Sequence, residues 1–406
     1  MIGTRIKQAR LACGLTLDEL SRRMTAAGHP ITKAALSKYE LSKSIPRPVF
    51  LAALAKMLGV RRSYFSEAAA IHVTWIAFRK RLAMPVKQQE QVQAFAAQVV
   101  ENQLWLQQLL YPQLRSNLPK SRRVSGIDDA EEAAASLREA WSLDDSPIDS
   151  LTATVEDHGG VVVACAGISE DCAGLSGTTD SGFPVAVVSL DAPNDRRRYN
   201  LAHEIGHLLF DWKHIAGKVS EQLANRFASA LIVPPAVARS ELGNKRRRLD
   251  FRELGLLKQK YGLSIQAWMR RALDLNIIEE SQYKGLCIEV GLKKWKKAEP
   301  VQFEFRGNET PSRLKQMTLR AFSEGVISAQ RAEQIIPGST EKMISPGDKA
   351  KLSAAEIRRL PREQRAAILS AAAVAAEADY LGNRDLTSFE AYGEDDLYDG
   401  NQSPKG

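Results

Sequence analysis

Two histidines with a glutamate between them are the residues whose types and spacing are best suited to metal binding and catalysis. His203, Glu204 and His207 stand in the stretch RRRYNLAHEIGHLLFDW, residues 196–212. On a helix, side chains four residues apart share a face, so both imidazoles can bind one zinc ion, and Glu204 then lies beside a water that the metal activates. The alternative is that both histidines lie at the edge of a buried core and bind no metal.

Glu221 is the candidate third ligand for this metal. It lies in the first turn of a second predicted helix, SEQLANRFASALIVPP, residues 220–235, which the two prolines end. A helix that returns antiparallel to the first can present this carboxylate to the metal. Asn225 lies four residues later on the same face and can bond to the free ring N–H of a ligating histidine. The combined spacing is the arrangement of gluzincin-type peptidases.

Three strands are predicted before these helices. The segment GGVVVACAG, residues 159–167, indicates a buried strand bounded by glycines, and residues 172–193 contain two more strands with turns. The predicted fold class is therefore α+β and mostly helical. It comprises an all-α N-terminal domain, an α+β domain with a small sheet that carries the histidines, and a helical C-terminal segment.

The segments RRRYNLAHEIGHLLF and SEQLANRFASALIVP resemble the hallmarks of the ImmA/IrrE family of metallopeptidases, and the similarity extends over about residues 128–300. The resemblance implies a gluzincin-like domain in which His203, His207 and Glu221 bind Zn²⁺ and Glu204 is the general base of metal-assisted peptide hydrolysis. A second hypothesis stays open, in which the site binds metal but cleaves little and serves structure or regulation.

The N-terminal part of the chain is strongly basic. Residues 1–64 contain twelve lysines and arginines but three acidic residues, so they account for the net charge of +8, and the rest of the chain is close to neutral. A basic module of this kind indicates a polyanionic partner. Its apolar residues recur at three- and four-residue spacing, which predicts short helices joined by tight turns.

Two of these helices match the helix-turn-helix plan. Thr16 and Thr32 are the predicted N-caps, and the second helix spans residues 32–40 with Leu36 and Tyr39 facing the core. The side chains predicted to contact DNA from this helix and the turn after it are Lys33, Ala34, Ser37, Lys38 and Lys43. Because this set holds no arginine, asparagine or glutamine, we expect modest sequence specificity or a dependence on dimerisation.

Residues 2–65 resemble the phage-repressor (Cro/cI-like, XRE) family, on the pattern Tyr39-Glu40-Leu41-Ser42-Lys43 followed by Pro46. The resemblance implies binding to double-stranded DNA. The turn before Thr32 is longer than usual in the family, and Leu17 stands where a polar contact residue is common. The alternative is a helix-turn-helix fold that contacts protein only.

The predicted domains follow from these patterns. They are an XRE helix-turn-helix domain at 1–66, a helical connector at 67–125, an ImmA/IrrE-like metallopeptidase domain at 126–305, a linker at 306–350, and a helical segment with an acidic tail at 351–406. The long helix predicted near 87–110 is a candidate surface for a homodimer. The C-terminal tail resembles the toxin-binding tails of small bacterial antitoxins, and a solvated helix with a disordered end is the alternative.

Composition limits the remaining choices. No run approaches the roughly 20 apolar residues of a membrane span, the N-terminus has no apolar signal core, and the four cysteines are scattered without a CxxC pair. We therefore expect a cytoplasmic protein that does not bind membranes. The favoured function is a DNA-binding regulator that hydrolyses a regulatory protein, such as a repressor or an antitoxin-like partner. The alternative is a transcriptional regulator or antitoxin whose peptidase-like domain binds metal or a toxin-like partner.

Overall fold

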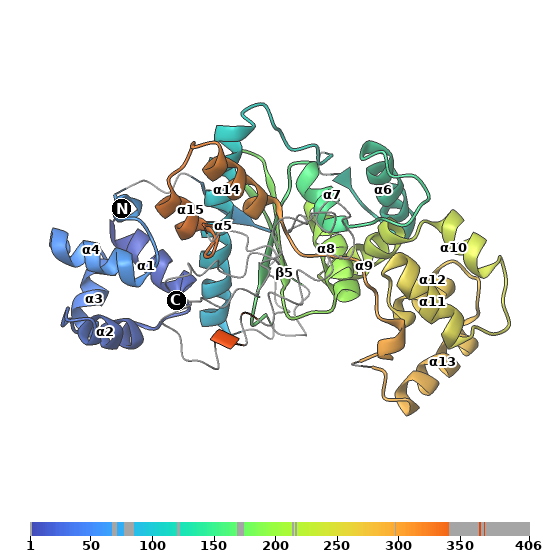
Figure 1. Ribbon diagram of the computed structural model, residues 1–406. Coiled ribbons are helices and arrows are strands. Elements are labelled where there is room, and N and C mark those ends of the chain that lie inside the picture. The colour runs from blue at the N-terminus through green and yellow to red at the C-terminus, as the bar shows by residue number, and fades with distance from the viewer. Residues whose placement is uncertain are drawn as a thin grey trace, which may run out of the picture. The chain divides into compact units, whose positions relative to one another are not determined.

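The computed structural model describes residues 2–66, 71–76, 85–119, 122–168, 174–212, 215, 217–296 and 298–340, together with 365, 366 and 369. The chain divides into two compact units, Met1–Thr340 and Glu341–Gly406, and nearly all described residues belong to the first. Figure 1 shows the helices and strands. The predicted C-terminal helix and acidic tail lie outside the described residues, apart from those last three positions.

The N-terminal helices enclose a core of their own, in which Leu36 is fully buried. Both predicted caps are confirmed. Thr16 Oγ1 accepts a hydrogen bond from Glu19 N at 3.1 Å, Thr16 N donates to Glu19 Oε2 at 2.6 Å, and Thr32 Oγ1 accepts from Ala35 N at 3.2 Å. The elements are α1 (Ile2–Ala12), α2 (Leu17–Ala26), α3 (Lys33–Glu40), α4 (Pro48–Met57) and the 3₁₀-helix η1 (Arg62–Phe65).

A four-stranded sheet forms the centre of the following region. Its order is β1 (Val73–Trp75), β4 (Leu175–Thr179), β5 (Pro184–Ser189) and β3 (Val161–Cys165). β4 is antiparallel to both of its neighbours, and β3 runs parallel to β5. The three strands predicted from the sequence are confirmed, whereas β1 comes from the stretch that the sequence predicts as a helical connector. A separate short pair joins β2 (Arg122–Arg123) to β6 (Phe210–Asp211).

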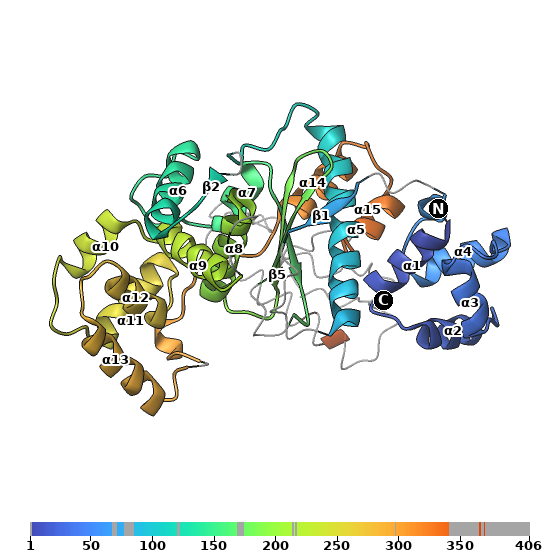
Figure 2. The same ribbon diagram turned by 180° about the vertical axis from the view of Figure 1, so that it is seen from behind.

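The two faces of the sheet carry different helices, because alternate side chains of a strand point to opposite faces. Val163 and Val187 pack with α5 (Val86–Leu110), whereas Val162 and Ala186 pack with α8 (Asn194–Leu209). In both views α5 and α8 lie on opposite sides of β5 (Figures 1 and 2). The apolar side of α5, the helix that the sequence analysis proposes as a homodimer surface, packs on the sheet, and α5 also contacts α1. The homodimer stays a prediction.

The largest core lies on the α8 side of the sheet and contains Trp268, Phe227 and Leu201, all fully buried. The helices that build it are α6 (Ile127–Ala140), α7 (Leu151–Asp157), α9 (Gly217–Ile232), α10 (Pro235–Leu242), α11 (Phe251–Tyr261), α12 (Ile265–Asp274) and α13 (Glu280–Leu292), with the 3₁₀-helix η3 (Val301–Phe303). Among the helices that the structure describes, none combines the length and apolar character needed to cross a bilayer.

The described part of the predicted linker contains two helices, α14 (Arg313–Ser323) and α15 (Ala329–Ile335). Met317 and Ala321 of α14 and Ile335 of α15 form a small core with Leu106 of α5. Glycine, serine and proline in this stretch are typical of the linker that the sequence predicts. They mark the turns around the two helices, while the apolar residues between them are buried.

Candidate functional site

The candidate metal centre lies between α8, which carries His203, Glu204 and His207, and α9, which carries Glu221. Gly206 allows these two helices to approach closely. A Cβ at that position would lie 3.1 Å from Cδ1 of Phe227 in α9, so any larger residue would press against the facing helix.

The structure brings the three predicted ligands together. His203 Nε2 lies 3.0 Å from His207 Nε2, and these two atoms lie 3.5 and 3.6 Å from the nearer carboxylate oxygens of Glu221. A tetrahedral zinc ion with bonds of about 2.0–2.1 Å holds its ligand atoms about 3.3–3.4 Å apart. The spacing of the three side chains therefore fits one zinc ion. Both imidazoles are buried, and the Glu221 side chain is 30% exposed, so the centre opens on the side of Glu221.

Asn225 orients the first histidine, as the sequence predicted for its position. Its Oδ1 lies 2.9 Å from His203 Nδ1 and can accept the proton of that ring nitrogen, so Nε2 is the nitrogen that faces Glu221. The Tyr199 hydroxyl lies 3.3 Å from the same Oδ1 and 3.2 Å from the Asn225 carbonyl oxygen. On the other ligand, Trp212 Nε1 donates to the His207 carbonyl at 2.9 Å and its ring packs on the imidazole.

The side chain of Glu204 is buried where α8 faces β4. Burial raises the pKa of its carboxyl, while the neighbouring His203 imidazole and Ser176 hydroxyl oppose the rise. Among the described residues, its Oε2 atom has no hydrogen-bond partner. An unpaired carboxylate oxygen in a buried site is costly unless a water or ligand occupies the place beside it. The position therefore suits a group that exchanges a proton with a bound molecule.

The two imidazoles influence each other. Burial and the neighbouring His203 lower the pKa of His207 to about 4. Burial also acts to lower the pKa of His203, but the carboxylates of Glu221 and Glu204 outweigh it and raise that pKa above its ordinary value. The two rings therefore do not both carry a positive charge at neutral pH, and the neutral imidazole is the form that binds a metal.

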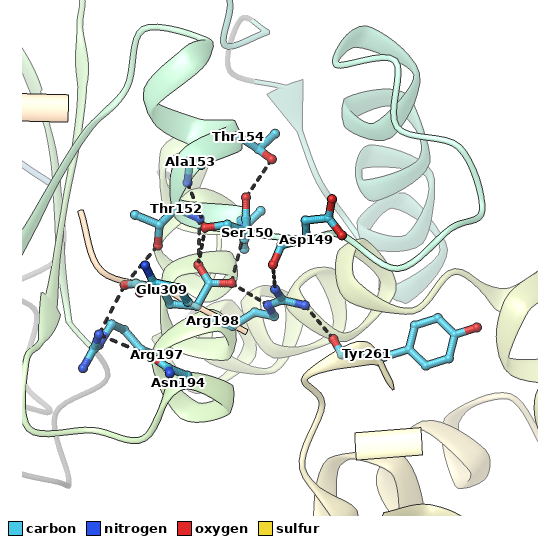
Figure 3. A network of polar contacts seen from close by, with 12 residues as sticks. Asp149, Ser150, Thr152, Ala153, Thr154, Asn194, Arg197, Arg198, Tyr261 and Glu309 are labelled. Carbon is cyan, nitrogen blue, oxygen red and sulfur yellow. Dashed lines mark hydrogen bonds and ion pairs between the residues drawn. The ribbon is translucent and has the colours of Figure 1, made fainter. Parts of the chain in front are cut away.

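A buried polar network fixes the first half of α8 (Figure 3). Arg198 and Glu309 form an ion pair at 2.6 Å in which both side chains are 0% exposed. The Glu309 carboxylate also accepts from the backbone N–H groups of Leu151 and Thr152 at 3.1 and 2.8 Å, at the start of α7. Arg198 donates further to the Asp149 carbonyl at 2.8 Å. The helix of the histidines is thus tied to α7 and to the chain segment before α14.

The residues predicted to contact DNA lie on the outer side of the N-terminal domain. Those on α3 or in the turn after it are Lys33, Ala34, Lys38 and Lys43, which are exposed, and Ser37, which is half-buried. Lys33 Nζ lies 2.6 Å from Asp18 Oδ2 in a solvent-exposed ion pair. Such a pair is weak in water, so a phosphate or a base can compete for this lysine.

Two residues of the metal centre were missed by the sequence analysis. Tyr199 lies one helical turn before His203, and the four-residue spacing was the available signal. Ser176 is a polar residue in an apolar strand, and it is fully buried beside Glu204. Nothing in the sequence indicated that this strand packs against the helix at Glu204.

Two family models match the chain. The helix-turn-helix model matches residues 6–65, and a peptidase family model described as the IrrE N-terminal-like domain matches residues 155–273. No curated protein and no solved structure gives a significant match. The matched ranges contain α3 and the metal centre respectively, so the fused architecture expected from the resemblance is confirmed. The chain joins an XRE-type helix-turn-helix module to an ImmA/IrrE-like peptidase domain.

Proposed function

We propose that this chain is a DNA-binding regulator whose second domain is a zinc-dependent endopeptidase. The observation that carries the proposal is the convergence of one ligand atom each from His203, His207 and Glu221, with the buried carboxylate of Glu204 next to the first histidine. Two imidazoles and one carboxylate are one of the donor sets that catalytic zinc sites use when a fourth position stays open.

The three side chains would hold Zn²⁺, and Asn225 would keep His203 in the tautomer that binds it. Zinc, when bound, supplies a Lewis acid that polarises a carbonyl and brings the pKa of water toward about 7. Glu204 would take the proton of the attacking water with its unpaired Oε2 and pass it to the leaving amine. Burial raises the pKa of the Glu204 carboxyl toward neutral pH. A carboxylate with a raised pKa can both accept a proton and return it.

The substrate class follows from the fusion with the N-terminal domain. Lys33, Ala34, Ser37 and Lys38 of α3 would face the major groove and Lys43 a phosphate. A peptidase held on DNA in this way lies close to other DNA-bound proteins and to the regulators that act on them. We therefore propose a regulatory protein as substrate, a repressor or an antitoxin-like partner.

Metal analysis and one conservative substitution test the proposal. The zinc content of the purified full chain is measured for the wild type, His203→Ala and Glu221→Ala, and we expect near-stoichiometric zinc in the wild type and its loss in both variants. Glu204→Gln should keep zinc and DNA binding but lose cleavage of fluorescently labelled β-casein, an unfolded protein. Full zinc in Glu221→Ala would remove the third ligand. Equal cleavage by Glu204→Gln would remove the base and leave the regulator hypothesis.

A further inference from the structure

Strand β4 forms a wall of the metal centre. Gly174, the residue before this strand, lies so close to Glu204 that a Cβ there would be 3.1 Å from Glu204 Cγ and 3.2 Å from Oε1. Ser176 is fully buried, and its hydroxyl faces the same carboxyl. The backbone of residues 174–176 therefore lies beside the proposed base.

Strand β1 occupies the outer edge of β4 at this place (Figure 2). At one end of the antiparallel ladder, Asp180 N donates to the His72 carbonyl at 3.1 Å. At the other end, Ile76 N donates to the Ser176 carbonyl at 2.9 Å. The chain of β1 thus runs toward Gly174, and its Ile76 is bound to the residue whose side chain faces the proposed base.

An extended peptide binds to a sheet by adding a strand to an edge with free backbone groups. β4 has two edges, and β5 takes the inner one. A peptide that follows β4 toward Glu204 must therefore form its hydrogen bonds with the backbone groups of the outer edge. β1 engages this edge from Asp180 to Ser176, the residue whose side chain faces the proposed base.

We propose that the outer edge of β4 is the peptide-binding edge of the metal centre, and that the chain's own residues 72–76 occupy it as a built-in competitor. This inference rests on the proposed function, because it concerns the peptide that the same site would cleave. A peptide substrate displaces β1 and replaces its hydrogen bonds one for one, so the competitor holds the site latent without closing it permanently.

The side chains of β1 indicate which peptides fit this edge. Val73 and Trp75 pack on the α5 side of the sheet, and Thr74 and Ile76 lie on the α8 side by the two-residue period of a strand. Ile76 is 38% exposed, so the position next to the centre is not closed by packing. The fitting partner is an extended, uncharged segment with bulky apolar side chains at alternate positions.

Binding of a synthetic peptide tests the inference without depending on hydrolysis. The probe is fluorescein-labelled IHVTWIA, the sequence of residues 71–77. It is titrated into the zinc-loaded full chain carrying Glu204→Gln, alone or with Ile76→Pro or Ile76→Ala, and followed by fluorescence anisotropy. Proline removes the N–H that binds Ser176, while alanine keeps it. We expect at least about tenfold tighter binding to the proline variant and nearly unchanged binding to the alanine variant. Equal affinity for all three proteins would overturn the inference.

A cross-link covers the case in which the proline variant does not fold. Val73 and Thr179 lie opposite each other in the ladder, between hydrogen-bonded pairs, where facing side chains are closest. With Val73→Cys and Thr179→Cys in the Glu204→Gln chain, the oxidised form should bind the peptide at least tenfold more weakly than the reduced form. Equal binding in both forms would refute competition by β1. If binding responds as expected while neither the wild type nor the Ile76→Pro chain cleaves labelled β-casein, the edge assignment stands and the peptidase proposal fails.

Discussion

Replacing Asn225 tests how the centre holds its first histidine. The Asn225→Ala change removes the oxygen that lies 2.9 Å from His203 Nδ1, while the imidazole itself stays buried. Loss of such an outer partner of a metal-bound histidine costs about 10–100-fold in metal affinity. Asn225 itself lies at an exposed position of α9, so water can replace part of the lost acceptor in the variant. We therefore expect the lower end of the range, about tenfold, which corresponds to about 1.4 kcal/mol.

The assay is a zinc competition with a chromophoric chelator, performed on the full chain at pH 7.5. Asn225→Asp is the matched control, because it keeps an acceptor at nearly the same place and adds a negative charge that raises the basicity of the imidazole. It should bind zinc at least as tightly as the wild type. If the alanine and aspartate variants lose affinity equally, the hydrogen bond is not the cause. Wild-type affinity in the alanine variant would refute the positioning role of Asn225.

Three further outcomes are expected. Glu309→Ala leaves Arg198 buried without its carboxylate and should lower the free energy of unfolding by about 3–5 kcal/mol in urea titrations; a loss below about 1 kcal/mol would contradict the network of Figure 3. Burial raises the pKa of Glu156 to about 7, so the folded state holds this proton more tightly than the unfolded chain, and stability falls as pH rises from about 4.5 through 7. Relative to Glu156→Gln, the wild type should lose about 2–3 kcal/mol of its free energy of unfolding between pH 5 and pH 8. The same difference in stability between the two proteins at both pH values would exclude this titration. Lys38→Ala should weaken DNA binding and reduce the slope of log affinity against log salt by about 1, which titrations at several salt concentrations measure; an unchanged slope would remove Lys38 from the phosphate contacts.

The candidate metal centre could be predicted because much of its geometry is local. His203 and His207 lie one turn apart on one helix, and Glu221 and Asn225 repeat that spacing on the next helix, so periodicity places each pair on one face of its helix. The prolines after α9 and the threonine caps of the N-terminal helices also act on their immediate neighbours. Each of these signals is contained in about ten consecutive residues.

The contacts that sequence analysis missed join distant parts of the chain. Glu309 accepts from the start of α7, more than 150 residues earlier, and no periodicity connects these positions. β1 has three residues, which is too short for a pattern, and its partner strand lies about a hundred residues later. The helices α14 and α15 are short, and the turn residues around them resemble those of a linker. Their place is decided by tertiary packing, which local propensity does not encode.

The N-terminal domain and the metal centre are connected through packed elements as well as through the chain. Arg5 of α1 is buried and pairs with Glu101 of α5 at 2.6 Å, and the apolar side of α5 packs on the same sheet to which β1 belongs. Removing one partner of a buried ion pair is strongly destabilising, and this pair links α1 of the domain to α5. The strand that occupies the outer edge of β4 begins only a few residues after η1, the last element of that domain. If DNA binding shifts the occupancy of β1, linkage requires the reverse effect with the same factor. A peptide that displaces β1 would then change the affinity for DNA as much as DNA changes the affinity for the peptide, so one coupling free energy would govern both activities.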